Sequence, residues 1–340
     1  MVLKSAVLGW YGKNNIGDES YKLSFPKLLP NHELTFADTI SGEFDHIFLG
    51  GGDVVAPLSC AHQRHTLQKH AVSVTVSDEA SIDDLRMFDT LAVRDRLTVQ
   101  KLQVAGLNAL YVPDFAFALK PDRENGWKLW KDLFKSEGRD LYQNRVVVTL
   151  NAHLMAKMSE PARKHMMFEH LMFELAHAND HFNASFLFLP FGTSMPWDDR
   201  IPGGIVQSRC KFWRKNLAVY NRLTVQETLD IYAAATVAVS TRLHSTIFAT
   251  LGHTPFIDIT HNHKNSAFLA STGLQDYGFD YWSFNHAQFN SLLDTLLKGR
   301  GEVREKLRVI ANAERSSLAS FQKDVLDLQQ KPRGNSSNRF

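Results

Sequence analysis

Cysteine is scarce in this sequence. The 340 residues include only Cys60 and Cys210, which lie far apart and form no CxxC pair. This pattern argues against a disulfide framework or a structural zinc site, and it is typical of proteins from a reducing compartment. No apolar run reaches the length of a membrane span, and the first residues turn polar too early for a signal peptide. We therefore expect a cytoplasmic protein.

An excess of charge is also absent. Lysine and arginine number 38 and aspartate and glutamate 36, which gives a formal net charge of +2 at pH 7. A balance this even lacks the basic surface that nucleic-acid binding requires, so we expect no nucleic-acid partner. The sequence contains no HExxH motif, and His261-x-His263 alone is weak evidence for a metal site. We predict neither a metal nor a cofactor.

Apolar residues are plentiful, since 44% of the chain is hydrophobic, which is enough for two packed cores. Strand-like runs alternate with helical patterns, and this alternation predicts an α/β fold with parallel sheets covered on both faces. We expect two doubly wound domains that face each other across a central cleft. The strand-like runs are 5–10, 32–37, 46–51, 71–76, 89–94 and 108–113, then 145–150, 185–191, 236–240 and 255–259.

The alternation also indicates domain boundaries. We predict an N-terminal domain over residues 1–122, a polar helical linker over 123–144 and a C-terminal domain over 145–300. An amphipathic pattern predicts one or two C-terminal helices over 301–331. The polar end, residues 332–340, has the composition of a disordered tail.

Ligands of doubly wound sheets bind beyond the carboxyl ends of the strands, so the loops there are candidate sites. The first such loop, GWYGKNNIGDES (9–20), lacks the G-x-G-x-x-G spacing of dinucleotide-binding proteins. Its Asn14, Asn15 and Gly17 open a predicted helix and can bring backbone N–H groups to an anion or a hydroxyl. The alternative is a loop whose glycines only adopt positive φ.

The second loop, FLGGGDVVAP (48–57), has three consecutive glycines after a strand-like run. Gly51 and Gly52 let a ligand approach the backbone closely, and Asp53 at the rim can orient or deprotonate a sugar hydroxyl. A plain glycine turn with Asp53 as a helix N-cap is an equally open alternative.

Two further strand ends carry charged residues. Arg94 and Asp95 end one strand and begin a helix, where Asp95 is a natural N-cap and Arg94 a partner for it. Asp114, in VPDFAF (112–117), is either a cap or a carboxylate that faces the cleft. It is our second candidate for a general base, after Asp53.

The most informative junction is STRLHSTIFATLGHTPF (240–256). Arg242 and His244 stand between a predicted strand and a predicted helix, at a helix N-terminus that attracts anions. A guanidinium there opposes the helix dipole unless an anion is present, and its fork of donors suits phosphate or carboxylate. We therefore favour an anion-binding site over a surface arginine beside a core-edge histidine.

These segments, in this order, resemble the polysaccharide pyruvyl transferase family. The resemblance covers about Gly9 to Lys264, and the Arg-Leu-His helix start is its most specific part. It implies a GT-B-like fold with two Rossmann-like domains. It also implies transfer of pyruvate, as a ketal, from phosphoenolpyruvate to two hydroxyls of a sugar. The segments concerned are GWYGKNNIGDES, FLGGGD, VRDRLTVQKLQVAGL, VPDFAF and STRLHSTIFATLGHTPFIDI.

The partners that the resemblance implies are phosphoenolpyruvate and a glycan acceptor. The acceptor is a cell-surface polysaccharide or its lipid-linked oligosaccharide precursor, so a peripheral contact with the inner face of the membrane stays open. In GT-B-like folds as a class, the acceptor lies against the N-terminal half. The acceptor-side or loop candidates are Asn14, Asn15, Gly17, Gly51, Gly52, Arg94 and Asp114.

On the donor side, Arg242, Leu243 and His244 match the family residues that engage phosphoenolpyruvate and act in catalysis. Many relatives carry an arginine after the first strand of the second domain, where this chain has TLNAHLM with Asn151 and His153. After the last strand, where relatives often have a tyrosine ahead of a lysine, the chain has THNHKN (260–265). His153 and Lys264 complete our set of donor-binding candidates.

The chemistry of phosphoenolpyruvate fits these residue types. Its C2 becomes electrophilic when a proton reaches the methylene carbon, and cations must hold the carboxylate and the departing phosphate. Arg242 can hold the anion, His244 can hold or deliver a proton near neutral pH, and Asp53 can serve as the base. Two alternatives stay open: a GT-B glycosyltransferase that uses a nucleotide sugar, and a catalytically silent protein that binds glycans or anions.

Overall fold

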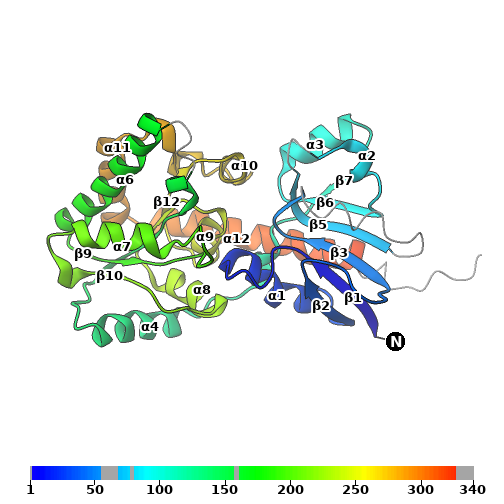
Figure 1. The fold of residues 1–340 in the computed structure, drawn as a ribbon, viewed down its shortest axis with the longest axis horizontal. Helices are drawn as coiled ribbons and strands as arrows, with labels where there is room; N and C mark the ends of the chain where they lie inside the picture. Colours follow the sequence, from blue (N-terminus) through cyan, green and yellow to red (C-terminus); the bar gives the residue numbers. More distant parts are fainter. Residues whose placement is uncertain (1, 55–67, 77–79, 157–160, 327–340) are drawn as a thin grey trace, which may run out of the picture. The chain divides into compact units, whose positions relative to one another are not determined.

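The structure is a computed structural model that describes residues 2–54, 68–76, 80–156 and 161–326 (Figure 1). The chain forms two compact units. It passes from one unit to the other four times: after Tyr11, within helix α1 (Ile16–Leu28), after Leu119 and within α12 (Gly301–Phe321). Unit 1 comprises Met1–Tyr11, Ser20–Leu119 and Asn312–Phe340, and unit 2 comprises Gly12–Glu19 and Lys120–Ala311.

Unit 2 is built on a six-stranded parallel sheet with the strand order β10-β9-β8-β11-β12-β13. The chain runs outward from β8 on one side and from β11 on the other, so the boundary between these two strands is the topological switch point. Every residue of β9 and β11 is buried, as expected of strands covered on both faces. The strands are β8 (Asn144–Thr149), β9 (Ala184–Phe188), β10 (Asn216–Ala218), β11 (Val237–Ser240), β12 (Phe256–Thr260) and β13 (Gly278–Asp280).

Helices cover this sheet on both faces. Side chains of α6, α7 and α11 pack in one core with Val146 and Val148 of β8. The alternate residue Val147 points to the opposite face, where Tyr232 of α8 and Phe248 of α9 pack against Phe191. The helices are α4 (Arg123–Ser136), α5 (His153–Ala156), α6 (Pro161–His181), α7 (Arg200–Arg209), α8 (Val225–Ala234), α9 (Leu243–Leu251), α10 (His263–Thr272) and α11 (His286–Lys298).

Unit 1 is also built on a parallel sheet, with the order β2-β1-β3-β5-β6-β7 and the short β4 paired with β5. Its chain order reverses between β1 and β3, which makes this boundary the switch point. The strands are β1 (Leu3–Leu8), β2 (His32–Ala37), β3 (His46–Gly50), β4 (Asp53–Val54), β5 (Gln68–Val76), β6 (Thr90–Val93) and β7 (Ala109–Tyr111).

The two faces of this second sheet have different cores. One is aliphatic and includes Leu49, Val93 and Leu102 together with α2 (Ile82–Leu85) and α3 (Arg96–Val104). The other is aromatic, and it joins rings of α1, the 3-10 turn Phe115–Ala118 and α12. Its ring pairs include Tyr21–Phe25, Tyr21–Phe115, Phe25–Phe115 and Phe115–Phe321.

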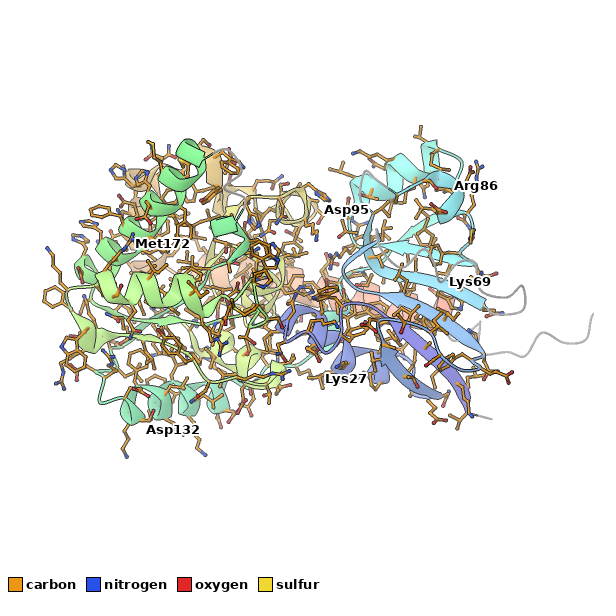
Figure 2. The ribbon with its side chains drawn as sticks, in the orientation of Figure 1. Lys27, Lys69, Arg86, Asp95, Asp132 and Met172 are labelled. Carbon is orange, nitrogen blue, oxygen red and sulfur yellow. The ribbon has the colours of Figure 1, made fainter. Side chains whose placement is uncertain are left out.

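Most of the local signals in the sequence act as predicted. The sequence TVQE (224–227) has the Thr-x-x-Glu spacing that predicts a capping box, and the structure confirms it. Thr224 accepts a hydrogen bond from the Glu227 amide, and the Glu227 carboxylate accepts one from the Thr224 amide. Asp95, labelled in Figure 2, caps α3 by accepting from the Thr98 amide at 2.7 Å. One helix, α12, followed by a π turn (Gln322–Leu326), occupies the region after residue 300. The predicted tail, residues 332–340, lies outside the described residues.

The basic and aromatic run RCKFWRKNLAVYNR (209–222) predicts a solvated helix face from its composition, and this prediction is wrong. Helix α7 ends at Arg209, and the following residues form the 3-10 turn Trp213–Lys215 and the edge strand β10. The strand forms because β10 pairs with β9, which satisfies its backbone groups, while Lys215 is buried and donates to the Phe182 carbonyl at 2.8 Å. Tertiary pairing thus overrides local pattern.

Backbone hydrogen bonds hold residues 12–19 to the rest of unit 2. The Ile16 amide donates to the Phe191 carbonyl at 2.7 Å, and the Thr193 amide donates to the Asn14 carbonyl at 3.2 Å. Gly17, in the first turn of α1, lies under the His244 ring: a Cβ on Gly17 would be 2.2 Å from His244 Nδ1. A side chain at position 17 therefore cannot coexist with the observed His244 ring position.

Three histidines lie together in the sheet of unit 1. His46 Nδ1 is 3.0 Å from His70 Nε2, and His70 Nδ1 is 3.1 Å from Thr90 Oγ1. The His32 and His70 rings each lie 5.3 Å, centre to centre, from the His46 ring. Burial lowers the pKa of His32 to about 4 and that of His70 to about 3, and it also lowers the pKa of His46.

This histidine row should make stability depend on pH. Unfolded histidines titrate near ~6.5, so the folded state binds these protons less readily than the unfolded chain. The contribution of these neutral histidines to the free energy of unfolding is fully present above that pH. It is lost as the pH falls toward 4 and 3, by up to about 1.4 kcal/mol per pH unit for each group. We expect the melting temperature of His70→Gln to vary less with pH over this range. His177→Gln, an exposed site on α6, should keep the wild-type slope; an unchanged slope in His70→Gln would contradict the assignment.

The contact between Gly17 and the His244 ring should reverse the stabilisation that a Gly→Ala substitution usually brings inside a helix. Gly→Ala inside a helix normally stabilises by about 0.5–1 kcal/mol. We expect Gly17→Ala to destabilise by roughly 1–3 kcal/mol, the range of overpacking, in a denaturant titration. Gly301→Ala is the matched control, because a Cβ there meets no atom within 4 Å. Combining Gly17→Ala with His244→Ala should remove most of the loss, and a stabilised Gly17→Ala single variant would refute the contact.

Candidate active site

The switch point of unit 2 gathers two strand ends. The Thr241 amide, after β11, donates to the Thr149 carbonyl of β8 at 3.0 Å. The Asn151 amide in turn donates to Thr241 Oγ1 at 2.7 Å. The chain segments that carry Arg242 and Asn151 are therefore held together beyond the carboxyl ends of their strands.

Arg242 is the N-cap residue of α9. Its backbone is extended (φ −123°, ψ 138°), and its side chain makes no capping hydrogen bond. Instead, Nη2 of the guanidinium lies 2.6 Å from Oδ1 of Asp199. The Arg242 side chain is 14% exposed and that of Asp199 is fully buried. The anion that offsets the Arg242 charge is thus a protein carboxylate, where we expected a ligand anion from the sequence.

Asp199 joins three segments around Arg242. Its Oδ1 also accepts from the Ala152 amide at 2.9 Å, in the segment after β8. Its Oδ2 accepts from the amides of Phe191 and Gly192 at 3.1 and 2.8 Å, in the segment after β9. A fully buried carboxylate is stabilised by such charge-assisted hydrogen bonds. Asp199 therefore fixes the position of the guanidinium relative to two neighbouring strand ends.

A buried polar network lies beneath the first turn of α9. Asp258, at β12, accepts hydrogen bonds from Thr246 Oγ1 and from Asn265 Nδ2, the latter at 2.7 Å. Burial raises the pKa of Asp258 to about 6, although these hydrogen bonds act in the opposite direction. The start of α9 is thus tied to a carboxylate that gains its proton in mildly acidic conditions.

His244 is half-buried one residue beyond Leu243, which is buried. The contact with Gly17 brings it against the segment that also carries Asn14 and Asn15, and Asn15 Oδ1 accepts from the Gly17 amide at 3.1 Å. The loop predicted for the acceptor side is thus placed with the donor candidates, within unit 2.

The other donor candidates flank Asn151. The His153 ring stacks on Trp197 with centres 4.5 Å apart, and its amide donates to Asn151 Oδ1 at 3.0 Å. Asn151 Nδ2 lies 3.3 Å from His261 Nε2. Lys264 is half-buried in the first turn of α10, where its amide is capped by Asn262.

The candidates of unit 1 form a separate, buried group. Arg94 pairs with Asp114 at 2.8 Å rather than with the neighbouring Asp95. Asp114 is 3% exposed, caps the 3-10 turn by accepting from the Ala116 amide, and accepts from the Tyr21 hydroxyl at 2.9 Å. Of the two roles left open for Asp114, the structure shows the cap. Burial raises the pKa of the Tyr21 phenol well above its usual value.

The glycine loop of unit 1 lies against the same tyrosine. Gly51 and Gly52 adopt positive φ (75° and 76°), and a Cβ on Gly51 would lie 2.7 Å from the Tyr21 ring. The Asp53 backbone forms β4, and its side chain lies outside the part of the chain that the structure describes.

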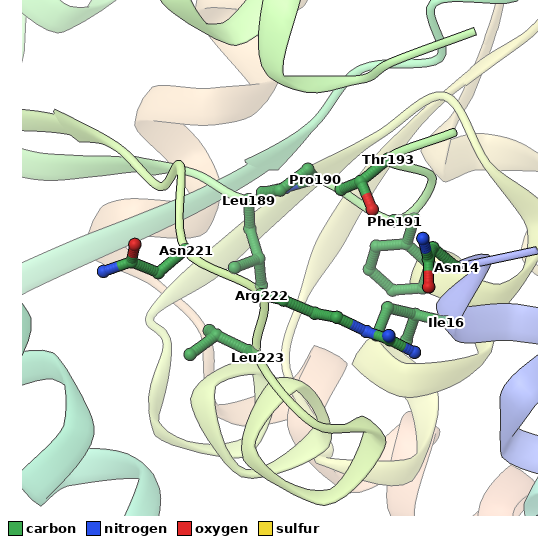
Figure 3. A pocket seen from close by; sticks show the side chains of 9 residues that line it. All are labelled: Asn14, Ile16, Leu189, Pro190, Phe191, Thr193, Asn221, Arg222 and Leu223. Atoms are coloured by element: carbon green, nitrogen blue, oxygen red, sulfur yellow. The ribbon is translucent and has the colours of Figure 1, made fainter. Parts of the chain in front are cut away.

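A small pocket lies beside the anchored segment of unit 2 (Figure 3). Figure 3 shows the Arg222 side chain reaching toward Asn14 and Ile16. The pocket volume of about 10 Å³ is near the space that one water molecule needs, so it is too small for phosphoenolpyruvate or a sugar. Its walls are formed by Asn14, Ile16, Leu189, Pro190, Phe191, Thr193, Asn221, Arg222 and Leu223.

Sequence reasoning missed the segment after β9. Asp199, Gly192 and Trp197 all belong to it, and none was singled out. The signal was available: FGTSMPWDD follows a predicted strand, and the rule on strand ends applies to it as to the other loops. Its neighbouring acid, Asp198, has a local role, since it pairs with Arg200 at 2.5 Å.

None of the helices in the described ranges is both long and apolar enough to cross a membrane.

Comparison with solved structures shows the fold. A putative UDP-N-acetylglucosamine 2-epimerase from Listeria monocytogenes is 10% identical, with a TM-score of 0.62 over 98% of this chain and 99% of that one. The apo structure of OtsA is 10% identical, with a TM-score of 0.54 over 94% of this chain and 78% of that one. A UDP-forming trehalose-phosphate synthase from Burkholderia xenovorans is also 10% identical, with a TM-score of 0.52 and coverages of 84% and 74%.

At these identities the similarity establishes the fold alone, and the predicted GT-B-like fold is confirmed. No protein of curated function matches the sequence. The family profile described as polysaccharide pyruvyl transferase matches residues 5–263, which include Arg242, His244 and the segment around Gly17. The chain therefore belongs to the polysaccharide pyruvyl transferase family.

Proposed function

We propose that the protein transfers pyruvate from phosphoenolpyruvate to two hydroxyls of one sugar, forming a cyclic ketal and releasing phosphate. Family membership supports this proposal. The observation that carries it concerns the Arg242 guanidinium at the start of α9. Asp199 holds its Nη2, and its Nε has no acceptor among the described residues. The proposed acceptor is a cell-surface polysaccharide or its lipid-linked precursor.

Arg242 is suited to hold a small anion. Its Nη2 is bonded to Asp199, which fixes the orientation of the planar group. Its Nε is buried and has no hydrogen-bond acceptor among the described residues. Buried donors are normally paired, so the unpaired Nε leaves the guanidinium with unused capacity to donate, and the side chain is 14% exposed to a ligand. Phosphoenolpyruvate offers a phosphate and a carboxylate for this purpose.

The proposed reaction adds two hydroxyls to C2 of the enol. The first hydroxyl bonds to C2 while the methylene carbon gains a proton and becomes a methyl group. The second hydroxyl then bonds to C2 as the C–O bond to phosphate breaks, and its proton is released. His244, two residues after Arg242, is the proposed proton donor, and Asp53 is the proposed base for the hydroxyl.

His153 and Lys264 remain proposed donor contacts. In this chain, Asn151 and His153 stand where many relatives have an arginine. The stacking of His153 on Trp197 holds its ring at the end of β8. The positions of both candidates in unit 2 support a donor site with its second cation supplied by imidazole or by Lys264.

The proposal can be tested by measuring phosphoenolpyruvate binding, which needs no knowledge of the acceptor. We expect Arg242→Ala to weaken binding to the purified chain by about 100-fold or more, measured by isothermal titration calorimetry, because a bidentate charge-assisted contact is lost. Arg200→Ala is the matched control, since Arg200 pairs with the adjacent Asp198. The control should bind as wild type does, and equal binding by Arg242→Ala would overturn the assignment.

The same titration separates the alternatives. Stabilisation by UDP or GDP in place of phosphoenolpyruvate would favour a glycosyltransferase. Binding without phosphate release in any glycan mixture would favour a silent anion-binding protein.

Breaking the Asp199–Arg242 ion pair should also lower the free energy of unfolding. Asp199→Asn leaves the buried guanidinium without its carboxylate, and breaking such a pair typically costs about 3–5 kcal/mol. We expect a loss of this size in a urea titration. The double variant Asp199→Asn with Arg242→Leu should recover part of it, with the remainder due to the Ala152, Phe191 and Gly192 amides. A double variant no more stable than Asp199→Asn would show that the pair adds nothing.

A further inference from the structure

A cluster of metal-ligating side chains lies where α6 meets α11, which Figure 1 shows as neighbouring helices. His170 and Glu174 are one turn apart on α6, and His286 is the first residue of α11. The His170 and His286 rings lie 5.8 Å apart, centre to centre. One ligand atom from each of the three residues lies within 4.8 Å of the other two.

The distances suit a tetrahedral ion. Zinc binds imidazole nitrogen and carboxylate oxygen at roughly 2.0–2.1 Å, which places neighbouring ligand atoms about 3.4 Å apart. His170 Nε2 and Glu174 Oε1 are 3.5 Å apart. The ligand atom of His286 lies within 4.8 Å of those of the other two residues, and its side chain is exposed and therefore has room to adjust.

The burial of Glu174 points to a cation. Its side chain is only 6% exposed, and among the described residues its one ion-pair partner is His170. A carboxylate removed from water needs a paired charge or several donors. The His170 side chain is 39% exposed, so an ion held here would keep one coordination position open to solvent.

We propose that His170, Glu174 and His286 bind a divalent transition-metal ion of the zinc type, with water as the fourth ligand. Two imidazoles and one carboxylate form a ligand set that zinc accepts. The ion links the middle of α6 to the first turn of α11, beside Phe284, whose ring lies 6.1 Å from that of His170. This site is separate from Arg242, and the proposed pyruvyl transfer does not use it.

Zinc titration of the chelator-treated full chain tests the site. We expect one zinc ion per chain by calorimetry and a higher melting temperature in its presence. Glu174→Gln and His286→Ala should each weaken binding by more than the roughly 10- to 100-fold that loss of an outer-shell partner causes. His286→Ala alters an exposed side chain, so its fold should be retained even if Glu174→Gln misfolds.

A pair of histidines elsewhere on α6 provides the matched control. His177 and His181 are exposed and four residues apart, with rings 5.9 Å apart and nearly parallel. Two histidines at this spacing can also attract zinc. His177→Ala should leave the affinity unchanged if the proposal is right. Loss of binding in His177→Ala with retention in His286→Ala, or no zinc binding by the wild type, would overturn it.

Discussion

The buried ion pair between Asp199 and Arg242 is the interaction on which the candidate site depends. Both oxygens of the carboxylate are occupied, by amides from the segments after β8 and β9 and by the guanidinium after β11. Three strand ends of one sheet are thereby held in a single geometry. Removing two charges from water is unfavourable, so the pair is better explained by the position it enforces than by net stability.

The fixed position of the Arg242 guanidinium connects the fold of unit 2 with the proposed reaction. The order of the unit 2 strands makes the boundary between β8 and β11 the place where ligands of doubly wound sheets bind. Arg242 follows one of these strands and Asn151 the other. The amide network around Asp199 leaves the guanidinium with a buried Nε and an orientation that a flexible surface arginine lacks.

Periodicity and caps predicted most of the fold, because they are local properties of the chain. The alternation of strand-like and helical runs, the Thr224 capping box and the helix start at Arg242 needed no distant contact to be recognised. Long-range pairing could not be predicted in this way. The partner of Arg94 is Asp114, the partner of Arg242 is Asp199, and β10 exists because β9 lies beside it. The passage of α1 between the two units was likewise not anticipated.

Asp258 gives the start of α9 a variable electrostatic environment. Burial raises the pKa of this carboxyl to about 6, so it takes up its proton at a higher pH than an exposed aspartate does. Each proton that it takes up removes a negative charge from beneath the helix end that carries Arg242 and His244. Mild acidification therefore makes the electrostatic potential at this helix end more positive, which favours negatively charged groups there.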